Sequence, residues 1–212
     1  MAHRSRTFRY FVYFAALILV AAVANAFWVS RVSFLRSAAE YWIVSDPEGP
    51  ADAAAIFGGG VETRPFAAAE YYRKRLVHKS LVSNVRVRKT EALGVLPLHA
   101  DFNRAVLTKL GVPDNDIETF GNELSNSYEE ALALKKWALR NGARSIIVPT
   151  EIFSSRRVRW ICNREFAGLM TSVNIIALDD PEFSRTGWWR NENGVISFQN
   201  EIVKYLYYRV RY

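Results

Sequence analysis

Short apolar runs alternate with longer segments of helical periodicity from residue 51 to the end of the chain. The first run, 53–57, is closed by three consecutive glycines, which indicates a buried strand that enters a tight loop. The clearest run, 145–148, reads Ser-Ile-Ile-Val and is followed by a proline. The pattern predicts strands over 53–57, 81–87, 117–120, 145–148 and 173–178, and helices over 64–78, 100–110, 127–141, 154–166 and 198–208.

The order of these elements predicts the fold class. Strands that alternate with helices need crossover connections, and such connections produce a mostly parallel sheet with helices on both faces. We therefore expect a Rossmann-like three-layer α/β/α sandwich. The run 81–87 alternates with Asn84, Arg86 and Arg88, which favours a strand at the edge of that sheet.

The N-terminal part of the chain follows a different pattern. Residues 10–29 contain no charged side chain, and a helix of about 20 residues at 1.5 Å each crosses the ~30 Å hydrocarbon core of a membrane. Arg4, Arg6 and Arg9 precede this run, which indicates that its N-terminal side stays in the cytoplasm and the remainder is exported. We expect a cytoplasmic tip and transmembrane anchor over 1–30, a turn-rich connector over 31–50 and an α/β domain over 51–212.

A cleaved signal peptide is the alternative to the anchor. Ala24, Asn25 and Ala26 fit the small-x-small pattern that signal peptidase cuts after an apolar region. The uncharged run is longer than the ~7–15 residue apolar region of a typical signal peptide, which favours the anchor. Both interpretations place the domain outside the cytoplasm.

Composition and charge narrow the classes of partner. The chain has 28 basic and 21 acidic residues, a net charge of +7, which favours anionic partners such as phosphate groups or acidic lipid headgroups. The basic residues are spread over several segments without a recognisable nucleic-acid motif, so no nucleic-acid partner is predicted. His3, His78 and His99 lack cysteine or carboxylate neighbours at ligand spacing, so no metal site is predicted. Cys162 is the single cysteine, which excludes an intrachain disulfide.

Three strand-to-helix loops form the candidate site, because ligands of open α/β sheets bind beyond the carboxyl ends of the strands. The first loop contains Gly58, Gly59 and Gly60, with Arg64 in the following helix. Consecutive glycines let backbone N–H groups approach an anion closely, although they equally fit a tight turn that needs positive φ. The spacing matches neither the dinucleotide fingerprint nor the Walker loop, so no cofactor is assigned.

The second loop contains Glu123, Asn126, Ser127 and Glu129. Glu123 and Glu129 flank the loop and are candidates for acid/base catalysis, while Asn126 and Ser127 are candidates for ligand contacts. Ser127 and Glu130 also have the S-x-x-E spacing of a helix capping box, which would give them a purely structural role.

The third loop extends from Thr150 to Arg157. Arg156 and Arg157 fall in the first turn of their predicted helix, where a cation opposes the helix dipole at a cost of roughly 0.3–1 kcal/mol each. A bound anion would reverse that cost, since the planar guanidinium binds phosphate through two parallel hydrogen bonds. Alternatively, the two arginines contact acidic neighbours at the surface. Thr150 and Arg157 are therefore predicted to bind the ligand.

Taken in order, these segments resemble the YdcF-like family, a domain of unknown function found in bacterial envelope proteins. The resemblance rests on the strand with its three glycines and Arg64, the segment from Glu123 to Glu129, and the Ile-Val-Pro-Thr150 strand with Arg157. It implies a Rossmann-like domain tethered to the bacterial inner (plasma) membrane by a single span, with the C-terminal domain in the periplasm. It also implies a role in cell envelope and peptidoglycan biogenesis.

The chain departs from that family at two places. Ser154 stands where the family often has a histidine after the threonine-bearing strand, and Ser83 is followed by Asn84 where the family often has glycines. These departures predict a ligand pocket that differs from those of better-studied relatives, without a histidine-dependent mechanism.

The leading functional hypothesis is an envelope-biogenesis protein that binds, or also processes, an anionic phosphate-bearing ligand. A lipid-linked cell-wall precursor or carrier fits this description. One alternative is a non-catalytic module for a nucleotide or S-adenosylmethionine, which the resemblance associates with some relatives. Another is an adaptor for other envelope proteins. Whether the protein is an enzyme stays open at this point.

Overall fold

The computed structural model describes residues 2–212, with side chains from Phe8 onward. Its contacts divide the chain into two compact units, Met1–Glu40 and Tyr41–Tyr212, which are described separately.

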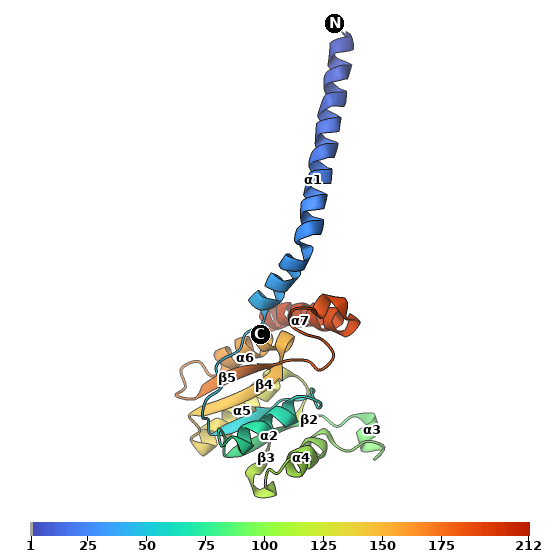
Figure 1. Ribbon diagram of the computed structural model, residues 1–212. Helices are drawn as coiled ribbons and strands as arrows, with labels where there is room; N and C mark the ends of the chain where they lie inside the picture. The colour runs from blue at the N-terminus through green and yellow to red at the C-terminus, as the bar shows by residue number, and fades with distance from the viewer. Residues whose placement is uncertain (1) are drawn as a thin grey trace. The chain divides into compact units, whose positions relative to one another are not determined.

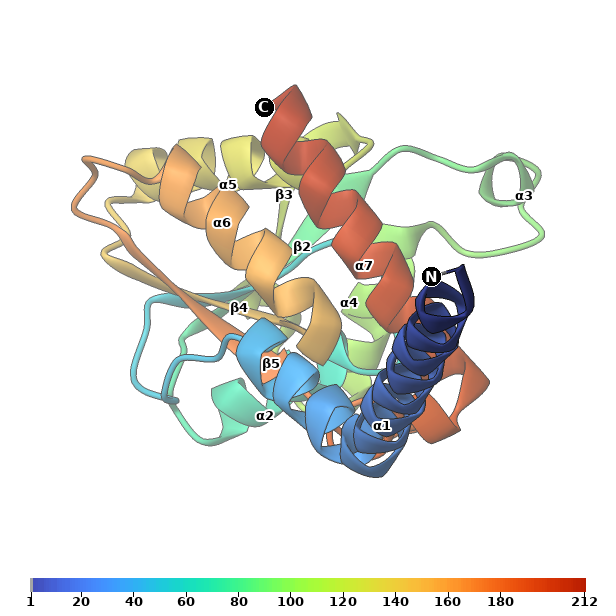
Figure 2. The ribbon, with the colours of Figure 1, turned by 90° about the horizontal axis from the view of Figure 1, so that it is seen from above.

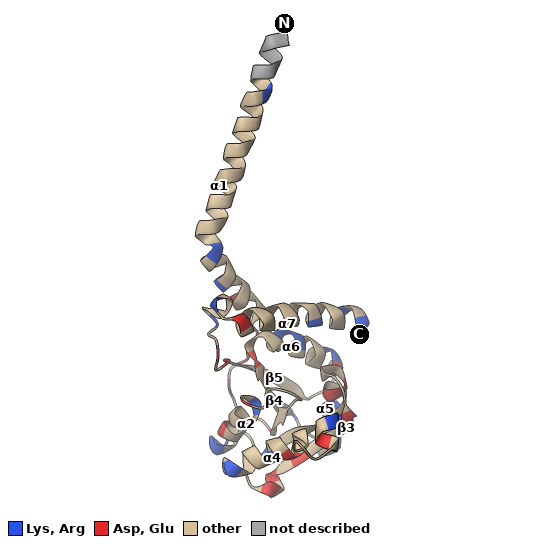
Figure 3. Cartoon of the chain, turned by 90° about the vertical axis from the view of Figure 1, so that its right-hand side faces the viewer, with Lys and Arg blue, Asp and Glu red and all other residues tan. Residues whose placement is uncertain are grey.

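The first unit consists of most of helix α1 (Ala2–Trp42). No charged side chain lies between Arg9 and Arg31 on this helix (Figure 3). The stretch Phe8–Trp42 is long and apolar enough to cross a membrane by length and composition, a test that a signal sequence near the N-terminus also meets. The expected connector over 31–50 is helical as far as Trp42, so only its second half is the extended, turn-rich segment that the sequence indicated.

The second unit contains a five-stranded, all-parallel sheet of order β3-β2-β1-β4-β5 (Figure 1). This confirms the predicted fold class. The strands are β1 (Ala53–Ile56), β2 (Lys79–Val85), β3 (Ile117–Leu124), β4 (Ser145–Glu151) and β5 (Ser172–Leu178). The helices are α2 (Arg64–Arg73), α3 (Lys89–Ala92), α4 (His99–Lys109), α5 (Ser127–Asn141), α6 (Ser155–Glu165) and α7 (Glu192–Arg211), with short 3-10 turns η1 (Asp114–Asp116), η2 (Ile152–Ser154) and η3 (Trp188–Arg190).

The alternation of side chains along β1 divides the core into two layers. Ala53, Ala55 and Phe57 pack with apolar residues of α5 and α6 and with Tyr208 of α7. Ala54 and Ile56 point to the opposite face, where they pack with residues of α2 and with Leu107 of α4. Successive strand residues face opposite sides, so this one strand is buried on both faces, as expected for the centre of a parallel sheet.

The prediction that the second strand lies at an edge is wrong. β2 pairs with β1 on one side and β3 on the other, and β3 and β5 form the edges of the sheet. Residues 80–83 of β2 are all buried. The polar alternation that suggested an edge falls at the end of the strand and beyond it, at Asn84, Arg86 and Arg88, where the chain leaves the core.

The segment between β2 and α4 was not resolved into elements from the sequence. It projects from the body of the domain and carries the short helix α3 (Figures 1 and 2). Residues 86–90 of this segment are exposed.

The strand order reverses at β1 and β4, which are neighbours in the sheet although β2 and β3 separate them in sequence. The chain leaves β1 toward α2 on one face of the sheet and leaves β4 toward α6 on the other. Their two connecting loops therefore diverge, and a crevice opens between them at the carboxyl edge. This switch point is where open α/β sheets bind their ligands.

Candidate functional site

A cavity of about 800 Å³ lies at this edge of the sheet. Its walls come from the loops after β1, β2, β3 and β4 and from one side of α7. Its lining consists largely of glycines and of polar or charged side chains: Gly58, Gly59, Gly60, Arg64, Arg86, Arg88, Lys89, His99, Asn126, Ser127, Glu130, Glu151, Ser154, Arg157, Glu201, Lys204 and Tyr208.

The structure brings together most of the residues predicted from the sequence. The three loops converge, and the cavity is lined by Gly58, Gly59, Gly60, Arg64, Asn126, Ser127 and Arg157. Glu123, Glu129 and Thr150 do not line this cavity.

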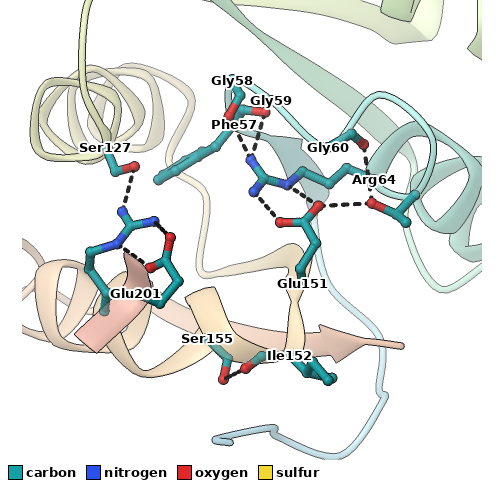
Figure 4. Close-up of polar contacts among 12 residues, drawn as sticks. Phe57, Gly58, Gly59, Gly60, Arg64, Ser127, Glu151, Ile152, Ser155 and Glu201 are labelled. Carbon is teal, nitrogen blue, oxygen red and sulfur yellow. Dashed lines mark hydrogen bonds and ion pairs between the residues drawn. The ribbon is translucent and has the colours of Figure 1, made fainter. Parts of the chain in front are cut away.

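Arg64 is almost completely buried and fully engaged with protein groups. Its Nε donates to Glu151 Oε1 at 3.0 Å, and its Nη2 donates to Glu151 Oε2 at 2.5 Å (Figure 4). Its Nη1 donates to the carbonyl oxygens of Phe57 at 3.1 Å and Gly58 at 2.8 Å. Burial by itself lowers the pKa of Arg64, but the adjacent Glu151 carboxylate more than offsets this and raises it. Arg64 therefore holds the glycine loop against β4.

Glu151 ends β4 and is the counter-ion of Arg64. Burial alone raises the pKa of this carboxyl, but the guanidinium outweighs burial and keeps the pKa below its usual range. Thr63 occupies the N-cap position of α2, but its side chain does not cap the helix and its hydroxyl donates to Glu151 at 2.8 Å.

Arg157 is also buried and has its own carboxylate. Its Nε and Nη2 donate to the two oxygens of Glu201 at 2.7 and 3.2 Å, and Nη1 donates to the Ser127 hydroxyl at 2.9 Å (Figure 4). The guanidinium carbon lies 5.4 Å from the ring centre of Tyr208. The anion expected beside this arginine at the start of α6 is therefore supplied by α7 of the same chain.

Arg156 serves a different purpose from its neighbour and does not line the cavity. Its Nε donates to the carbonyl of Trp42 at 3.0 Å, and its Nη2 donates to the carbonyl of Tyr41. These carbonyls end α1 and have no partner within the helix. Arg156 therefore satisfies the C-terminus of α1.

Glu130 is the carboxyl at the centre of the cavity wall. It accepts hydrogen bonds from the Gly58 backbone N–H and from the Ser83 hydroxyl, the latter at 2.7 Å. Its side chain is almost fully buried, and this burial raises its pKa, although both hydrogen bonds and the nearby arginines act in the opposite direction. Glu130 therefore holds its proton to a higher pH than an exposed glutamate does.

Two N–H groups of the glycine loop already donate hydrogen bonds to side chains of the protein. Gly58 donates to Glu130, and Gly59 donates to His99 Nε2 at 3.2 Å. Burial lowers the pKa of His99, so its ring is neutral at pH 7 and accepts this bond. Gly59 and Gly60 have φ of +90° and +54°, so the tight-turn interpretation of the three glycines is confirmed.

The cap of α5 is shifted by one residue from the prediction. The N-cap is Asn126, whose side chain accepts from the N–H groups of Tyr128 and Glu129 at 3.0 and 3.1 Å. Glu129 in turn accepts from the N–H and hydroxyl of Ser125. The capping box of Ser127 with Glu130 is therefore wrong. Glu129 is engaged in the cap, and Glu130 is released to face the cavity.

The two remaining candidates have structural explanations. Glu123 is exposed and has a φ of +54°, a left-handed backbone conformation at the end of edge strand β3. Thr150 is buried in β4, and its hydroxyl has no hydrogen-bond partner among the described residues. Neither is placed to contact a ligand in the cavity.

The unpaired positive charge of the cavity lies on its rim, defined here as Arg86, Arg88 and Lys89. Six basic side chains and three carboxylates line the whole cavity, which gives a formal excess of three positive charges. Arg64 and Arg157 are paired, and Lys204 shares Glu201 with Arg157 at 3.0 Å. Arg86, Arg88 and Lys89, on the exposed segment after β2, have no ion pair in the described part of the chain.

Sequence reasoning missed the carboxylates and the rim. Glu151 directly follows the predicted Thr150, and its position at a strand end was the available signal. Glu201 lies 44 residues from Arg157, and no local pattern connects the two. The sequence interpretation assigned Arg86 and Arg88 to the polar positions of an edge strand and did not single out Lys89, which follows them.

The excess of positive charge at the cavity suits an anionic ligand. Across the residues that the structure describes, no group of three or more histidine, cysteine or acidic side chains is positioned to hold a metal ion.

The resemblance to the YdcF-like family stays a prediction, because comparison with known proteins neither supports nor opposes it. No protein-family model, no curated protein and no solved structure matches this chain.

Proposed function

We propose that the C-terminal domain binds an anionic, phosphate-bearing ligand in the cavity at the strand switch point. One observation carries this proposal: the exposed side chains of Arg86, Arg88 and Lys89 line the cavity and form no ion pair within the described chain. Exposed cations of this kind can bind a phosphate without first breaking an internal ion pair. The paired arginines below them shape the site and do not act as the primary clamp.

The end of β2 supports a phosphate over the ribose of a nucleotide. Dinucleotide-binding folds place an acidic residue near this strand end, where it accepts hydrogen bonds from the ribose hydroxyls. Here the positions are Asn84, Val85 and Arg86, which offer an amide, an apolar side chain and a cation. A guanidinium at this position suits a phosphate group.

We extend the proposal to a lipid-linked ligand and to a role in cell-envelope biogenesis. The helix α1 is compatible with a single-pass anchor, and the resemblance described above associates such domains with cell-wall precursors or lipid carriers. In this proposal the anchor lies in the bacterial inner membrane and the domain lies in the periplasm. A C-terminal alkaline phosphatase fusion tests the orientation, since that enzyme is active only after export. An inactive, stable fusion would refute it.

The binding proposal is tested with the full chain in nanodiscs. The probes are farnesyl phosphate, farnesol, inorganic phosphate and S-adenosylmethionine, and the measurement is calorimetric affinity. We expect farnesyl phosphate to bind and farnesol not to bind. Binding of inorganic phosphate with equal affinity would identify a free phosphate ligand, and binding of S-adenosylmethionine alone would replace the proposal by the nucleotide alternative.

Two triple variants with the same net charge distinguish a specific effect of the rim on ligand affinity from the effect of overall positive charge. Replacing Arg86, Arg88 and Lys89 by glutamine should weaken farnesyl phosphate binding at least about tenfold, since a hydrogen bond to a charged group contributes about 1.5 kcal/mol or more. The control replaces the exposed cations Arg73, Lys109 and Arg140, which lie outside the cavity, and changes the net charge equally. Equal loss in both triple variants would show that the rim has no specific role.

A further inference from the structure

The C-terminal helix α7 packs one face against the domain and leaves apolar side chains on its outer side. Gly194, Glu201 and Tyr208 recur every seven residues and are buried. Residues two positions further along lie on the opposite side of a helix, because two residues correspond to a rotation of about 200°. On a helix that covers a folded domain this outer side is normally polar.

The outer side of α7 instead carries an apolar stripe, defined here as Ile196, Val203, Leu206, Tyr207 and Val210, which the exposed Gln199 and Asn200 interrupt after its first residue. Val203 is 67% exposed and Val210 is 89% exposed. All five have an exposed fraction of 45% or more, so no described part of the chain covers them. The stripe therefore consists of large side chains at helical spacing that face outward.

We propose that this stripe of α7 lies on the surface of an anionic membrane. The charge of the helix supports a lipid surface as the occupant. The half of α7 after Glu201 has no acidic residue and carries Arg209 and Arg211 beside the stripe, while Lys204 lines the cavity and pairs with Glu201. A helix with an apolar face and basic flanks binds in the headgroup region, and each basic side chain near an anionic surface contributes about fivefold to the affinity.

The chain connectivity supports the same occupant. Trp42, the last residue of α1, packs edge-on against Phe198 and Tyr205 of α7, with ring centres 5.8 and 5.5 Å apart. Arg31 is the first charged residue after the apolar run of α1. Eleven residues separate Arg31 from Trp42, about 17 Å of helix at 1.5 Å per residue. If α1 is the membrane span, α7 is tethered close to the surface that the stripe would contact.

The contact would also bring the cavity near the membrane. Glu201, Lys204 and Tyr208 line the cavity from the inner side of α7. The cavity and the bilayer surface would then be separated by one helix, about 10 Å in diameter. The inference goes beyond the proposed function, because the stripe can contact lipid whether or not the cavity binds a phosphate.

The test uses spin labels on the full chain in nanodiscs that hold one copy each, with a second preparation that holds two copies in each disc. Val210→Cys places a label on the stripe, and Leu139→Cys places the control label on α5, where Leu139 is 58% exposed. Cys162 is fully buried and remains unlabelled. The discs contain either phosphatidylglycerol with phosphatidylcholine or phosphatidylcholine alone.

We expect the label at position 210 to lose most of its collisions with an aqueous nickel chelate and to gain collisions with oxygen in anionic discs. The control label should remain accessible to the chelate. Arg209→Gln with Arg211→Gln should restore access at position 210, as should discs without phosphatidylglycerol. Equal chelate access at positions 210 and 139 would overturn the inference. Shielding that arises only when two copies share a disc would also overturn it, by assigning the stripe to a second copy. Farnesyl phosphate affinity, measured on the same samples, reports separately on the cavity.

Discussion

Arginines lie both on the floor of the cavity, defined here as Arg64 and Arg157 with their carboxylates, and on its rim, but the floor is buried and the rim is exposed. Arg64 and Arg157 on the floor are buried, and each forms two hydrogen bonds with one carboxylate. Arg86 and Arg88 on the rim are exposed and have no ion pair among the described residues. A buried charge must be paired to be tolerated, whereas water stabilises an exposed one. The floor arginines therefore hold the structure together, and the rim arginines are free to bind.

The largest expected effect comes from removing a floor arginine. Arg157→Ala should lower the free energy of unfolding by about 3 kcal/mol, because it removes two hydrogen bonds to the buried Glu201 and leaves that carboxylate with only the exposed Lys204 as a partner. The matched rim variant Arg88→Ala should change it by less than about 0.5 kcal/mol. Urea denaturation of both measures the difference. The double change Arg157→Met with Glu201→Leu should recover most of the loss, and similar losses for the two single variants would contradict the comparison.

A smaller effect is expected from the glycine loop that rests on the floor. Both Gly59 and Gly60 have positive φ, so alanine at either position should cost about 1–2 kcal/mol through backbone strain. A Cβ at Gly60 would also collide with Glu151 Oε1 and lie 2.6 Å from Arg64 Nε, whereas a Cβ at Gly59 meets nothing within 4 Å. Gly60→Ala should therefore cost about 1–3 kcal/mol more than Gly59→Ala. Equal thermal stability of the two variants would show that the side chains of Arg64 and Glu151 can move away from the added Cβ without loss of stability.

The smallest effect concerns the pH dependence of the buried carboxyls. The folded pKa of Glu130 is raised above its usual 4.5, so its contribution to stability is present below pH 4.5 and is lost as pH rises through the folded pKa. Relative to Glu130→Gln, the wild type should lose about 1.4 kcal/mol for each pH unit inside this window.

The carboxyls of the floor should behave in the opposite way. Arg157 lowers the pKa of Glu201 even though burial alone raises it, so this stability is present above the unfolded pKa and is lost as pH falls through the folded one. Unfolding measured at a series of pH values for wild type, Glu130→Gln and Glu201→Gln distinguishes the two directions. Parallel curves for wild type and Glu130→Gln would mean that Glu130 does not titrate differently in the folded state.

The sequence was sufficient for the elements that depend on local pattern. Alternating apolar runs and helical segments predicted the parallel sheet with helices on both faces. Gly142 directly follows the predicted helix 127–141 and ends α5 in the left-handed conformation that is common for a glycine at this position. The strand-to-helix loops were located to within a few residues, but β3 and β4 continue through Glu123 and Thr150, which the sequence pattern had assigned to loops. These features depend on neighbours in sequence, which a single chain displays directly.

The tertiary structure decided the partners of the polar and charged groups. Arg157 meets a carboxylate 44 residues away, and Glu130 faces the cavity because the cap of α5 begins one residue earlier than the pattern suggested. The same holds for α7, where the sequence shows Ile202, Val203, Leu206 and Val210 near helical spacing but not which of them the domain covers. Helical spacing fixes which side chains share a face. Only packing determines whether that face meets the core, and only the folded chain places a charge beside its counter-ion.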